Sequence, residues 1–219
     1  KRYKLKLIED AAQSIASKFN NKPAGSFGDS GCFSAHPLKN LNAFGDSGYL
    51  VTNNKVIYNG AKQLSNHGMQ NRNIVKNIGY VSRMDNLQAA ILNFHLKHLG
   101  KIINIRRKNA KIYEQTLNSK FIKTPKEDIN SFDTYHTYVV KVRNRDKLMK
   151  YLKSKKINTA IHYPIPIHLQ PAFKVYGYKY GDFPVTEKLS KEILTLPINQ
   201  YLSTHNIKYI STMINNFYE

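Results

Sequence analysis

The chain has 219 residues, and 41% of them are hydrophobic, so it can bury a sizeable core and is not a disordered polymer. A single cysteine, Cys32, excludes an internal disulfide framework and a cysteine-built zinc site, and it fits a reducing cytoplasm. No apolar run reaches the ~18 residues of a membrane helix, so we expect no membrane span.

The formal net charge of +20 is the strongest compositional signal. It favours either a phosphate-rich partner (nucleic acid, an anionic membrane or a nucleotide-linked substrate) or a solvated surface on which lysine has accumulated. The basic residues are spread through the whole sequence and form only short clusters. Because the sequence contains no helix-turn-helix spacing, zinc-finger pattern or RNP-like aromatic motif, we predict no nucleic-acid partner.

Short strands joined by tight turns are predicted for the first part of the chain. An apolar run ends there in Glu9 and Asp10, as expected of a buried strand with acids at its carboxyl end. Farther on, glycines at positions 25, 28 and 31 separate short β-like runs, and His36-Pro37 would end the last of them. The strands expected in the whole chain are Leu5–Ile8, Cys32–Ser34, Tyr49–Thr52 and Tyr135–Val142.

Helical periodicity is strongest in the middle of the chain, where apolar residues recur at helical spacing from Asp85 onward. Asp85 is placed to cap this helix, and Gly100 would bend or interrupt it. Before it, Asn53 or Asn54 would cap a shorter helix that Gly68 terminates. The long helix is expected to cover Asp85–Leu117. Three further helices are expected at Asp146–Lys155, Val185–Ile193 and Thr204–Tyr218.

A change in sequence character near residue 120 predicts two portions. Residues 1–120 are expected to form a mainly α/β large domain that ends in a long connecting helix, and residues 121–219 a small α+β domain. Within the second portion, residues 157–172 carry three prolines and are expected to form an irregular loop. The predicted fold class is therefore α/β, with a small α+β domain at the C-terminal end.

The first portion offers a small set of residues that could carry chemistry: Asp10 at a strand end, Gln13, and the group Ser34, His36 and Lys39. A lysine is a poor nucleophile while protonated, with an unperturbed pKa of ~10.4, so it needs a pocket that desolvates it or places another cation nearby. Lys39 follows a strand and a His-Pro turn, and it is placed to project into such a pocket. On pattern alone, however, a surface charge is the commoner role in a chain with 34 basic residues.

Several longer motifs follow one another in order along nearly the whole chain. They are Glu9–Gln13, Gly28–Asp29, Phe33–Leu41, Gly45–Thr52, Asn66–Gly68, Ser82–Ala90, His162–Pro171, Gly181–Pro184 and Leu194–Pro197. Together they resemble the DegT/DnrJ/StrS-type sugar aminotransferases. This resemblance implies the large domain of a fold-type I pyridoxal-phosphate (PLP) enzyme.

The resemblance also implies a role for each residue of the first portion. Lys39 would hold PLP as a Schiff base and then shuttle a proton, while Asp10 would pair with the pyridinium nitrogen. Gln13 would bond near the ring hydroxyl, and Ser34 would donate a hydrogen bond to the 5′-phosphate. In the alternative interpretation Asp10 caps the following turn, Gln13 lies on the surface and Ser34 satisfies a strand edge.

The function implied by the resemblance is transfer of an amino group, with glutamate as the expected donor, to the keto-sugar of a nucleotide-linked deoxysugar. Such an enzyme would act as a cytoplasmic homodimer in polysaccharide biosynthesis. His36, His162, His168 and Gln170 would contact the substrate. The alternative is that His36 is a packed turn histidine and that the loop from His162 to Gln170 is a rigid connector.

The match departs from the family pattern in three ways. We expect the N-terminal portion of the family fold, with its helix N-terminus for the cofactor phosphate and its stacking aromatic ring, to be missing. Without it, the strand Leu5–Ile8 would lose neighbours and expose apolar edges. Val81 replaces an asparagine that would reach the partner subunit's cofactor phosphate, which leaves Arg83 as the remaining contact. Ser47 replaces a glycine, and a positive φ at this position would add strain of ~1 kcal/mol.

Three other interpretations compete with the aminotransferase. A PLP-dependent sugar dehydratase has a similar fold, but its relatives carry histidine in place of the Schiff-base lysine, so Lys39 argues against it. A catalytically incomplete fragment or remnant would follow from the missing N-terminal portion. A basic nucleic-acid-binding module would follow from the charge alone.

Overall fold

The structure, a computed structural model, describes residues 2–219 and comprises two compact units. One unit contains the residues up to Asn104 together with Glu127–His136, and the other contains Ile105–Lys126 and Thr137–Glu219. The chain therefore leaves the first unit and returns to it once. The boundary predicted near residue 120 falls within a segment of the second unit, and as a division between domains it stays a prediction.

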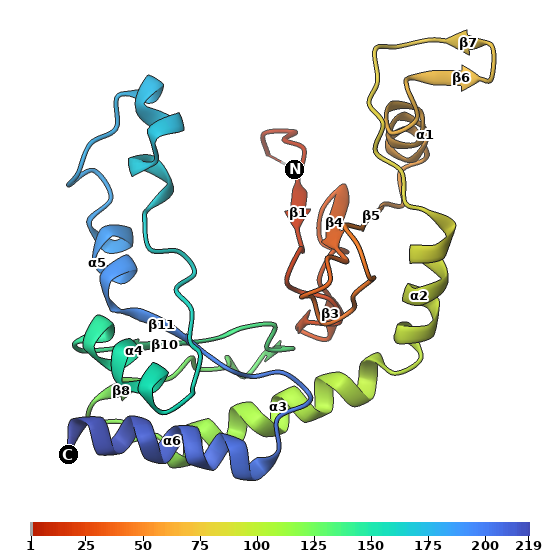
Figure 1. Cartoon of the computed structure of the whole chain (residues 1–219). Helices are drawn as coiled ribbons and strands as arrows, with labels where there is room; N and C mark the ends of the chain where they lie inside the picture. Colours follow the sequence, from red (N-terminus) through yellow and green to blue (C-terminus); the bar gives the residue numbers. More distant parts are fainter. Residues whose placement is uncertain (1) are drawn as a thin grey trace. The chain divides into compact units, whose positions relative to one another are not determined.

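The first unit is built on a three-stranded sheet with the order β1-β4-β5 (Figure 1). β1 runs parallel to β4, with Asp10 in register with Cys32, and β5 runs antiparallel to β4. The unit also contains the small sheets β3-β2-β9 and β6-β7. Its elements are β1 (Ile8–Asp10), β2 (Lys18–Phe19), β3 (Lys22–Pro23), β4 (Ser30–Ser34), β5 (Gly48–Val51), α1 (Lys55–Leu64), β6 (Met69–Asn71), β7 (Ile74–Val75), α2 (Asn86–Leu96), the start of α3 (Leu99–Thr116) and β9 (Ser131–Phe132).

The first strand lies near its predicted place but not in its predicted environment. β1 begins at Ile8, where the predicted strand ended. Leu5 is 80% exposed and Ile8 is 67% exposed, so the burial expected from the apolar run is wrong. The exposure is the one expected for this strand without the neighbours that the family's N-terminal portion would supply. Among the described strands, β1 pairs only with β4 and lies at the edge of its sheet, so one of its two edges has no paired strand.

The cap of α1 is one of the two asparagines predicted for it. The helix ends at Leu64 with Ser65 as its C-cap, before the Gly68 that was predicted to terminate it. Asn54 is the N-cap, and its Oδ1 accepts hydrogen bonds from the backbone N–H groups of Val56 (2.8 Å) and Ile57 (3.2 Å). Gly68, just beyond the helix, has a φ of 70°, and a Cβ there would lie 1.7 Å from the carbonyl oxygen of Asn77. Only glycine fits this turn without moving the backbone.

The long helix predicted from Asp85 is two helices, α2 and α3. The interruption falls at Lys97 and His98, not at Gly100, which lies inside α3. The N–H groups of these two residues bond three residues back, to Phe94 and His95, and such i→i−3 bonds tighten and end a helix. Buried side chains from both helices pack in one core cluster, which contains Ala35, Leu41, Ala43, Leu92, Leu99 and Ile103.

The second unit is an antiparallel sheet of order β11-β10-β8 with helices packed on it. Alternate residues of β10 (Tyr138, Val140 and Val142) are buried, as the period of two predicts. α6 lies along α3, where the Thr116 hydroxyl donates to that of Ser211 (2.8 Å) (Figure 1). The remaining elements are β8 (Ile122–Lys123), β10 (Tyr138–Val142), α4 (Arg145–Ser154), η1 (Ile167–Leu169), η2 (Pro171–Tyr176), α5 (Pro184–Glu192), β11 (Ile193–Leu196) and α6 (Thr204–Tyr218).

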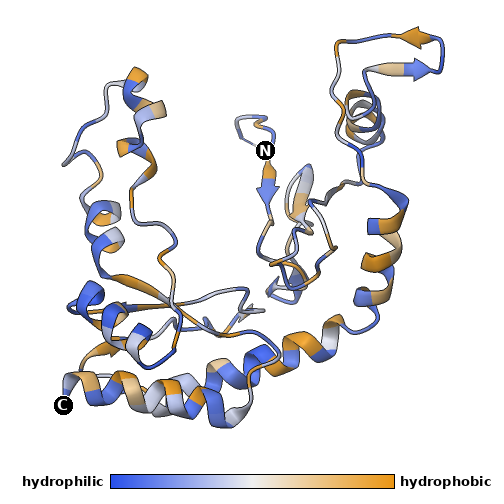
Figure 2. Cartoon of the chain, viewed as in Figure 1, coloured by the Kyte–Doolittle hydropathy of each residue, from blue (hydrophilic) through white to orange (hydrophobic). Residues whose placement is uncertain are grey.

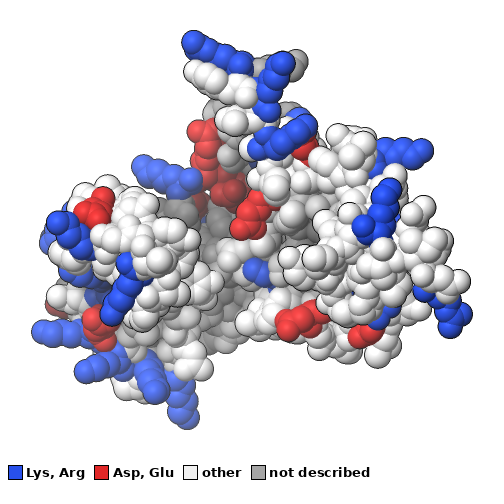
Figure 3. Space-filling view, turned by 90° about the horizontal axis from the view of Figure 1, so that it is seen from above, with Lys and Arg blue, Asp and Glu red and all other residues white. Residues whose placement is uncertain are grey.

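The exposed surface of the chain is basic and partly apolar. Lys and Arg side chains are spread over the face shown in Figure 3 and do not gather in one patch, which favours the solvated-surface interpretation of the charge. α2 carries hydrophobic residues around much of its circumference (Figure 2), and Leu87, Phe94 and Leu96 are each more than half exposed. Of the helices in residues 2–219, none has the length and apolar character to cross a membrane.

α4 ends with a lysine at a position that favours glycine. The N–H of Ile157 bonds to the carbonyl of Leu152 (2.9 Å), and the N–H of Lys156 bonds to that of Lys153 (3.0 Å). These are the two bonds of a Schellman motif, whose C′ residue adopts the left-handed conformation. Lys156 occupies that position with a φ of 61°. The side chain therefore costs conformational energy that glycine would avoid.

We expect the substitution Lys156→Gly to stabilise the second unit by up to about 1 kcal/mol, because it removes the Cβ from a left-handed residue. The midpoint of thermal unfolding should rise by a few degrees, by about 2–4 °C per kcal/mol. Lys153→Gly is the matched control, because it places glycine inside α4 and should lower the midpoint. A Lys156→Gly protein no more stable than the wild type would contradict this account of the helix end.

Glu9 holds the turn that leads into β4. Its carboxylate accepts hydrogen bonds from the backbone N–H groups of Gly25 (2.8 Å), Gly28 (2.7 Å) and Phe27. Partial burial raises the pKa of the Glu9 carboxyl, but these three donors and the nearby charge of Lys22 together lower it by more. The pKa of Glu9 therefore lies below its ordinary value of 4.5.

A carboxyl group with a depressed pKa in the folded state stabilises the fold above its unfolded pKa, and this stability is lost as the pH falls through its folded pKa. The urea midpoint of the wild type should therefore fall on acidification from about pH 5 downward. Glu9→Gln should be less stable at neutral pH and should lose less on acidification. Glu114→Gln, at an exposed position of α3, is the control and should follow the wild-type curve; identical curves for the Glu9 variant and the wild type would contradict the proposed linkage.

Candidate active site

Two of the predicted site residues meet at one edge of the first sheet. Asp10 is the last residue of β1, and Ser34 is the last residue of β4. The two strands are parallel neighbours, so their carboxyl ends lie at the same edge. In open sheets with parallel strands, this is the edge at which ligands bind.

Asp10 is exposed and only partly engaged. Its Oδ1 accepts a hydrogen bond from the N–H of Ala12 (3.1 Å), the turn-capping contact of the alternative interpretation. Among the described residues, its other oxygen makes no hydrogen bond or ion pair, so the carboxylate keeps an acceptor for a ligand. Gln13 is exposed nearby, on the segment that leaves β1.

Lys39 lies on a closed turn directly after β4. The Nδ1 of His36 accepts the N–H of Leu38 (3.1 Å), and the carbonyl of His36 accepts the N–H of Lys39 (2.8 Å). The Ser34 hydroxyl is 3.4 Å from the N–H of His36. Lys39 itself is half-buried, and within residues 2–219 its ammonium group has no hydrogen-bond or ion-pair partner. The ammonium group is therefore available for a ligand.

Buried residues that directly follow Lys39 in the chain fix the position of its backbone. Asn40 is only 2% exposed, and its Nδ2 donates to the carbonyl of Thr134 (2.9 Å). Leu41 and Ala43 follow in the core cluster, and the N–H of Ala43 bonds to the carbonyl of Ala35 (2.9 Å). Asn40 was not predicted as a functional residue, although its amide directly follows the candidate lysine.

His36 and Ser47 differ in what they contribute to this turn. The Nε2 of His36 lies 3.8 Å from Oδ1 of Asp46, and the histidine side chain is 45% exposed. Ser47 is not among the residues with a positive φ, so the strain expected at this position does not arise. Its carbonyl accepts the N–H of Ala35 (2.8 Å), while its buried hydroxyl has no hydrogen-bond partner among the described residues.

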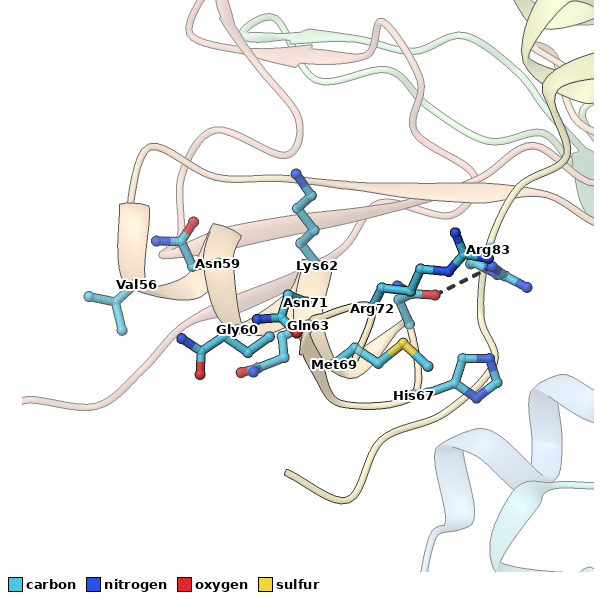
Figure 4. A pocket seen from close by; sticks show the side chains of 12 residues that line it. Val56, Asn59, Gly60, Lys62, Gln63, His67, Met69, Asn71, Arg72 and Arg83 are labelled. Atoms are coloured by element: carbon cyan, nitrogen blue, oxygen red, sulfur yellow. Dashed lines mark hydrogen bonds between the residues drawn. The ribbon is translucent and has the colours of Figure 1, made fainter. Parts of the chain in front are cut away.

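A basic pocket of about 860 Å³ lies between α1 and the β6-β7 hairpin of the first unit. Figure 4 shows the side chains that line it, including Lys62, His67, Arg72 and Arg83. The guanidinium of Arg83 donates to Oδ1 of Asn66 (3.4 Å), the dashed line in the same figure. Since no Asp or Glu is among the described residues that line it, the pocket suits an anion such as a phosphate group.

In the second unit, His162 and Gln170 line a hollow of about 430 Å³. The Nδ1 of His162 is hydrogen-bonded to the hydroxyl of Thr195 (2.8 Å), which orients an otherwise exposed ring. The Nε2 of Gln170 is 3.5 Å from the carbonyl of Ile165, at the limit of a hydrogen bond. Both side chains therefore keep polar atoms that could meet a ligand.

His168 has a different environment from the other predicted substrate residues. It is 6% exposed, and its Nε2 is hydrogen-bonded to Glu187 (3.0 Å). Burial raises the pKa of the Glu187 carboxyl, but the N–H groups of Gly181 and Phe183 and the His168 ring lower it by more. The contact supports a structural role for His168, and a contact between His168 and the substrate stays a prediction.

The sequence is similar to a known family over nearly its whole length. The family model described as the DegT/DnrJ/EryC1/StrS aminotransferase family matches residues 1–215. A pleiotropic regulatory protein of Geobacillus stearothermophilus is 38% identical over 100% of this chain and 59% of its own length. A UDP-2-acetamido-2-deoxy-3-oxo-D-glucuronate aminotransferase of Pseudomonas aeruginosa is 34% identical over 98% of this chain and 59% of its own length.

Solved structures agree with the sequence comparison. The crystal structure of DesV from S. venezuelae, in complex with a ketimine intermediate, matches with a TM-score of 0.96 and 30% identity, over 100% of this chain and 59% of that one. An aminotransferase of the same family from Brucella abortus matches with a TM-score of 0.93 and 34% identity, over 99% of this chain and 58% of that one.

The chain thus spans about 59% of the length of these relatives. Over that span its backbone follows theirs, which confirms the predicted α/β fold class. The motifs that carried the resemblance lie within the residues covered by the family model. The chain belongs to the DegT/DnrJ/EryC1/StrS aminotransferase family.

Proposed function

We propose that the protein, with PLP, transfers an amino group from an amino acid, expected to be glutamate, to a keto-sugar linked to a nucleotide. The observation that carries the proposal is the position of Lys39, a half-buried lysine without a protein partner among the described residues, on the turn after β4. The Pseudomonas relative is named as an aminotransferase of a UDP-linked oxo-sugar, which supports the same chemistry.

The residues at the edge of the first sheet fit PLP by their chemistry. They supply a lysine for covalent attachment, a carboxylate with a spare oxygen and a hydroxyl group (Lys39, Asp10 and Ser34). When bound, PLP supplies an electron sink for the bond that loses its proton. The Asp10 carboxylate would hold a proton on the ring nitrogen, and Gln13 would steady the ring near its hydroxyl.

Lys39 would have two tasks at this site. It would hold the cofactor covalently, and after release its amine would move a proton at the substrate carbon that exchanges its amino group. Ser34 would donate its hydroxyl hydrogen to the cofactor phosphate, and its weak 3.4 Å contact with the N–H of His36 leaves that hydrogen free to do so.

Contacts with the sugar are proposed separately for residues of each unit. These are His162 and Gln170 in the loop of the second unit and His36 in the first unit. A neutral imidazole or an amide can hydrogen-bond a sugar hydroxyl in either direction. Arg83, in the basic pocket, is proposed as a contact for a phosphate group, because Val81 has no side-chain donor.

A homodimer is proposed as the assembly. The support is α2, where large apolar side chains are exposed on several sides of one helix, a pattern typical of a helix that another polypeptide covers. A cytoplasmic location is proposed as well, since the free Cys32 fits a reducing compartment. A role in polysaccharide biosynthesis would follow from the sugar substrate.

Covalent binding of PLP tests the role of Lys39. The full chain mixed with PLP should gain an absorbance band near the visible edge, and borohydride should fix the cofactor mass on the peptide that contains Lys39. Lys39→Arg keeps the charge but should abolish both signals. Lys141→Ala removes another half-buried lysine and should preserve both. Labelling of another lysine would contradict the assignment, and absence of the band in the wild type would favour the incomplete-fragment alternative.

Activity and stability separate the roles of the two histidines. With glutamate and a UDP-linked 3-oxo-sugar, His162→Asn should lower the rate of 2-oxoglutarate formation about 10- to 100-fold, since it removes a hydrogen bond of ~1–3 kcal/mol. Its unfolding midpoint should stay near that of the wild type. His168→Asn should instead lower the midpoint by several degrees, because it breaks a buried bond to Glu187. The reverse pattern would assign the substrate contact to His168.

A further inference from the structure

A second pocket in the second unit has no part in the proposed transfer. It lies between the end of α4, residues 157–160, the loop after β11 and the first turns of α6, and its volume is about 750 Å³. This is within the ~300–1,000 Å³ of small-molecule sites. None of the residues proposed above for the cofactor or the sugar lines it.

The lining of this pocket combines positive charge with an apolar floor. Lys155 and Lys156 line the pocket, and no Asp or Glu is among the described residues around it. The floor includes Ile157 and Leu196, which are 5% and 1% exposed. A ligand that fits both features has an anionic end and a flat or apolar body.

The polar groups of the rim are hydrogen-bond donors suited to a base. Oδ1 of Asn206 already accepts from the N–H and the hydroxyl of Ser203 (3.0 and 2.7 Å), so its Nδ2 is the atom left to donate. Asn158 adds a second amide, and Tyr209 adds an aromatic ring that is 42% exposed. Amide donors match base carbonyls, and an exposed ring offers a stacking surface.

The backbone of Lys156 is a second, independent observation. This residue holds the left-handed C′ position of the helix end, where glycine is favoured, yet the chain has a lysine there. An unfavourable backbone position that is occupied by a charged side chain at a pocket is a reason to look for a function of that side chain.

From these features we propose that the pocket binds a nucleoside monophosphate. Its phosphate would lie against Lys155 and Lys156, and its base against Tyr209. Two residues that line the pocket, Ala160 and Thr195, also position His162. They pair with each other, and the Thr195 hydroxyl is hydrogen-bonded to the His162 ring (2.8 Å). A bound nucleotide would therefore stiffen the segment that carries His162. The binding does not depend on the proposed amino transfer.

Calorimetric titration of the full chain with uridine 5′-monophosphate, and separately with inorganic phosphate, tests the proposal. We expect the nucleotide to bind at least tenfold more tightly than phosphate. Lys156→Gly should weaken both ligands at least tenfold while the unfolding midpoint rises, so lost binding cannot be attributed to lost folding. Tyr209→Leu should weaken the nucleotide and leave phosphate unchanged.

The matched control is Lys4→Gly, which replaces another lysine with a positive φ (51°) in the first unit and should not change either affinity. Lys39→Arg should also leave nucleotide binding unchanged. The proposal is overturned if Lys156→Gly binds the nucleotide as the wild type does. It is equally overturned if the nucleotide binds no more tightly than phosphate, or if Lys39→Arg abolishes its binding, which would move the nucleotide to the proposed active site.

Discussion

The parallel pairing of β1 with β4 is the constraint on which the candidate site depends. It brings Asp10 and Ser34, which are far apart in the sequence, to one edge of the sheet, and the bond from the N–H of Ala11 to the carbonyl of Cys32 (2.9 Å) extends the pairing past the strand. A slip of one residue would turn Asp10 to the opposite face. The register is therefore as important to the proposed chemistry as the identity of the residues.

The adjacent acids Glu9 and Asp10 of β1 have different roles, one in folding and one in the proposed function. Side chains alternate along a strand, so Glu9 and Asp10 point to opposite faces. The Glu9 carboxylate accepts hydrogen bonds from three backbone N–H groups of the turn at Gly25–Gly28, and these bonds keep its pKa below the ordinary value. Asp10 is left exposed with an oxygen to spare. An ionised Glu9 thus stabilises the loop next to the carboxylate that is proposed to meet the cofactor.

Local features were predictable from the sequence, and long-range ones were not. The Asn54 cap and the helix Thr204–Tyr218 follow from neighbouring residues alone, and both were predicted. The turn before Lys39 was predictable for the same reason, because a strand and a His-Pro pair are adjacent to it. The partners of Asn40 and His168 lie in distant segments, at Thr134 and Glu187, and no spacing rule indicates them. The exposure of the Ile8 side chain likewise depends on which segments cover the faces of the sheet, which the strand's own residues cannot specify.

The loop that begins at His162 shows why two histidines of one motif need not share a role. The buried bond between His168 and Glu187 ties η1 to α5, and the same carboxylate receives the N–H groups of Gly181 and Phe183. The His168 end of the loop is therefore fixed by the buried carboxylate of Glu187. His162 keeps an exposed ring that only the Thr195 hydroxyl orients. A ring held by one hydroxyl can adjust to a ligand, whereas moving a buried, hydrogen-bonded ring would leave the carboxylate of Glu187 short of a donor. His168 thus anchors the loop on which His162 is proposed to contact the substrate.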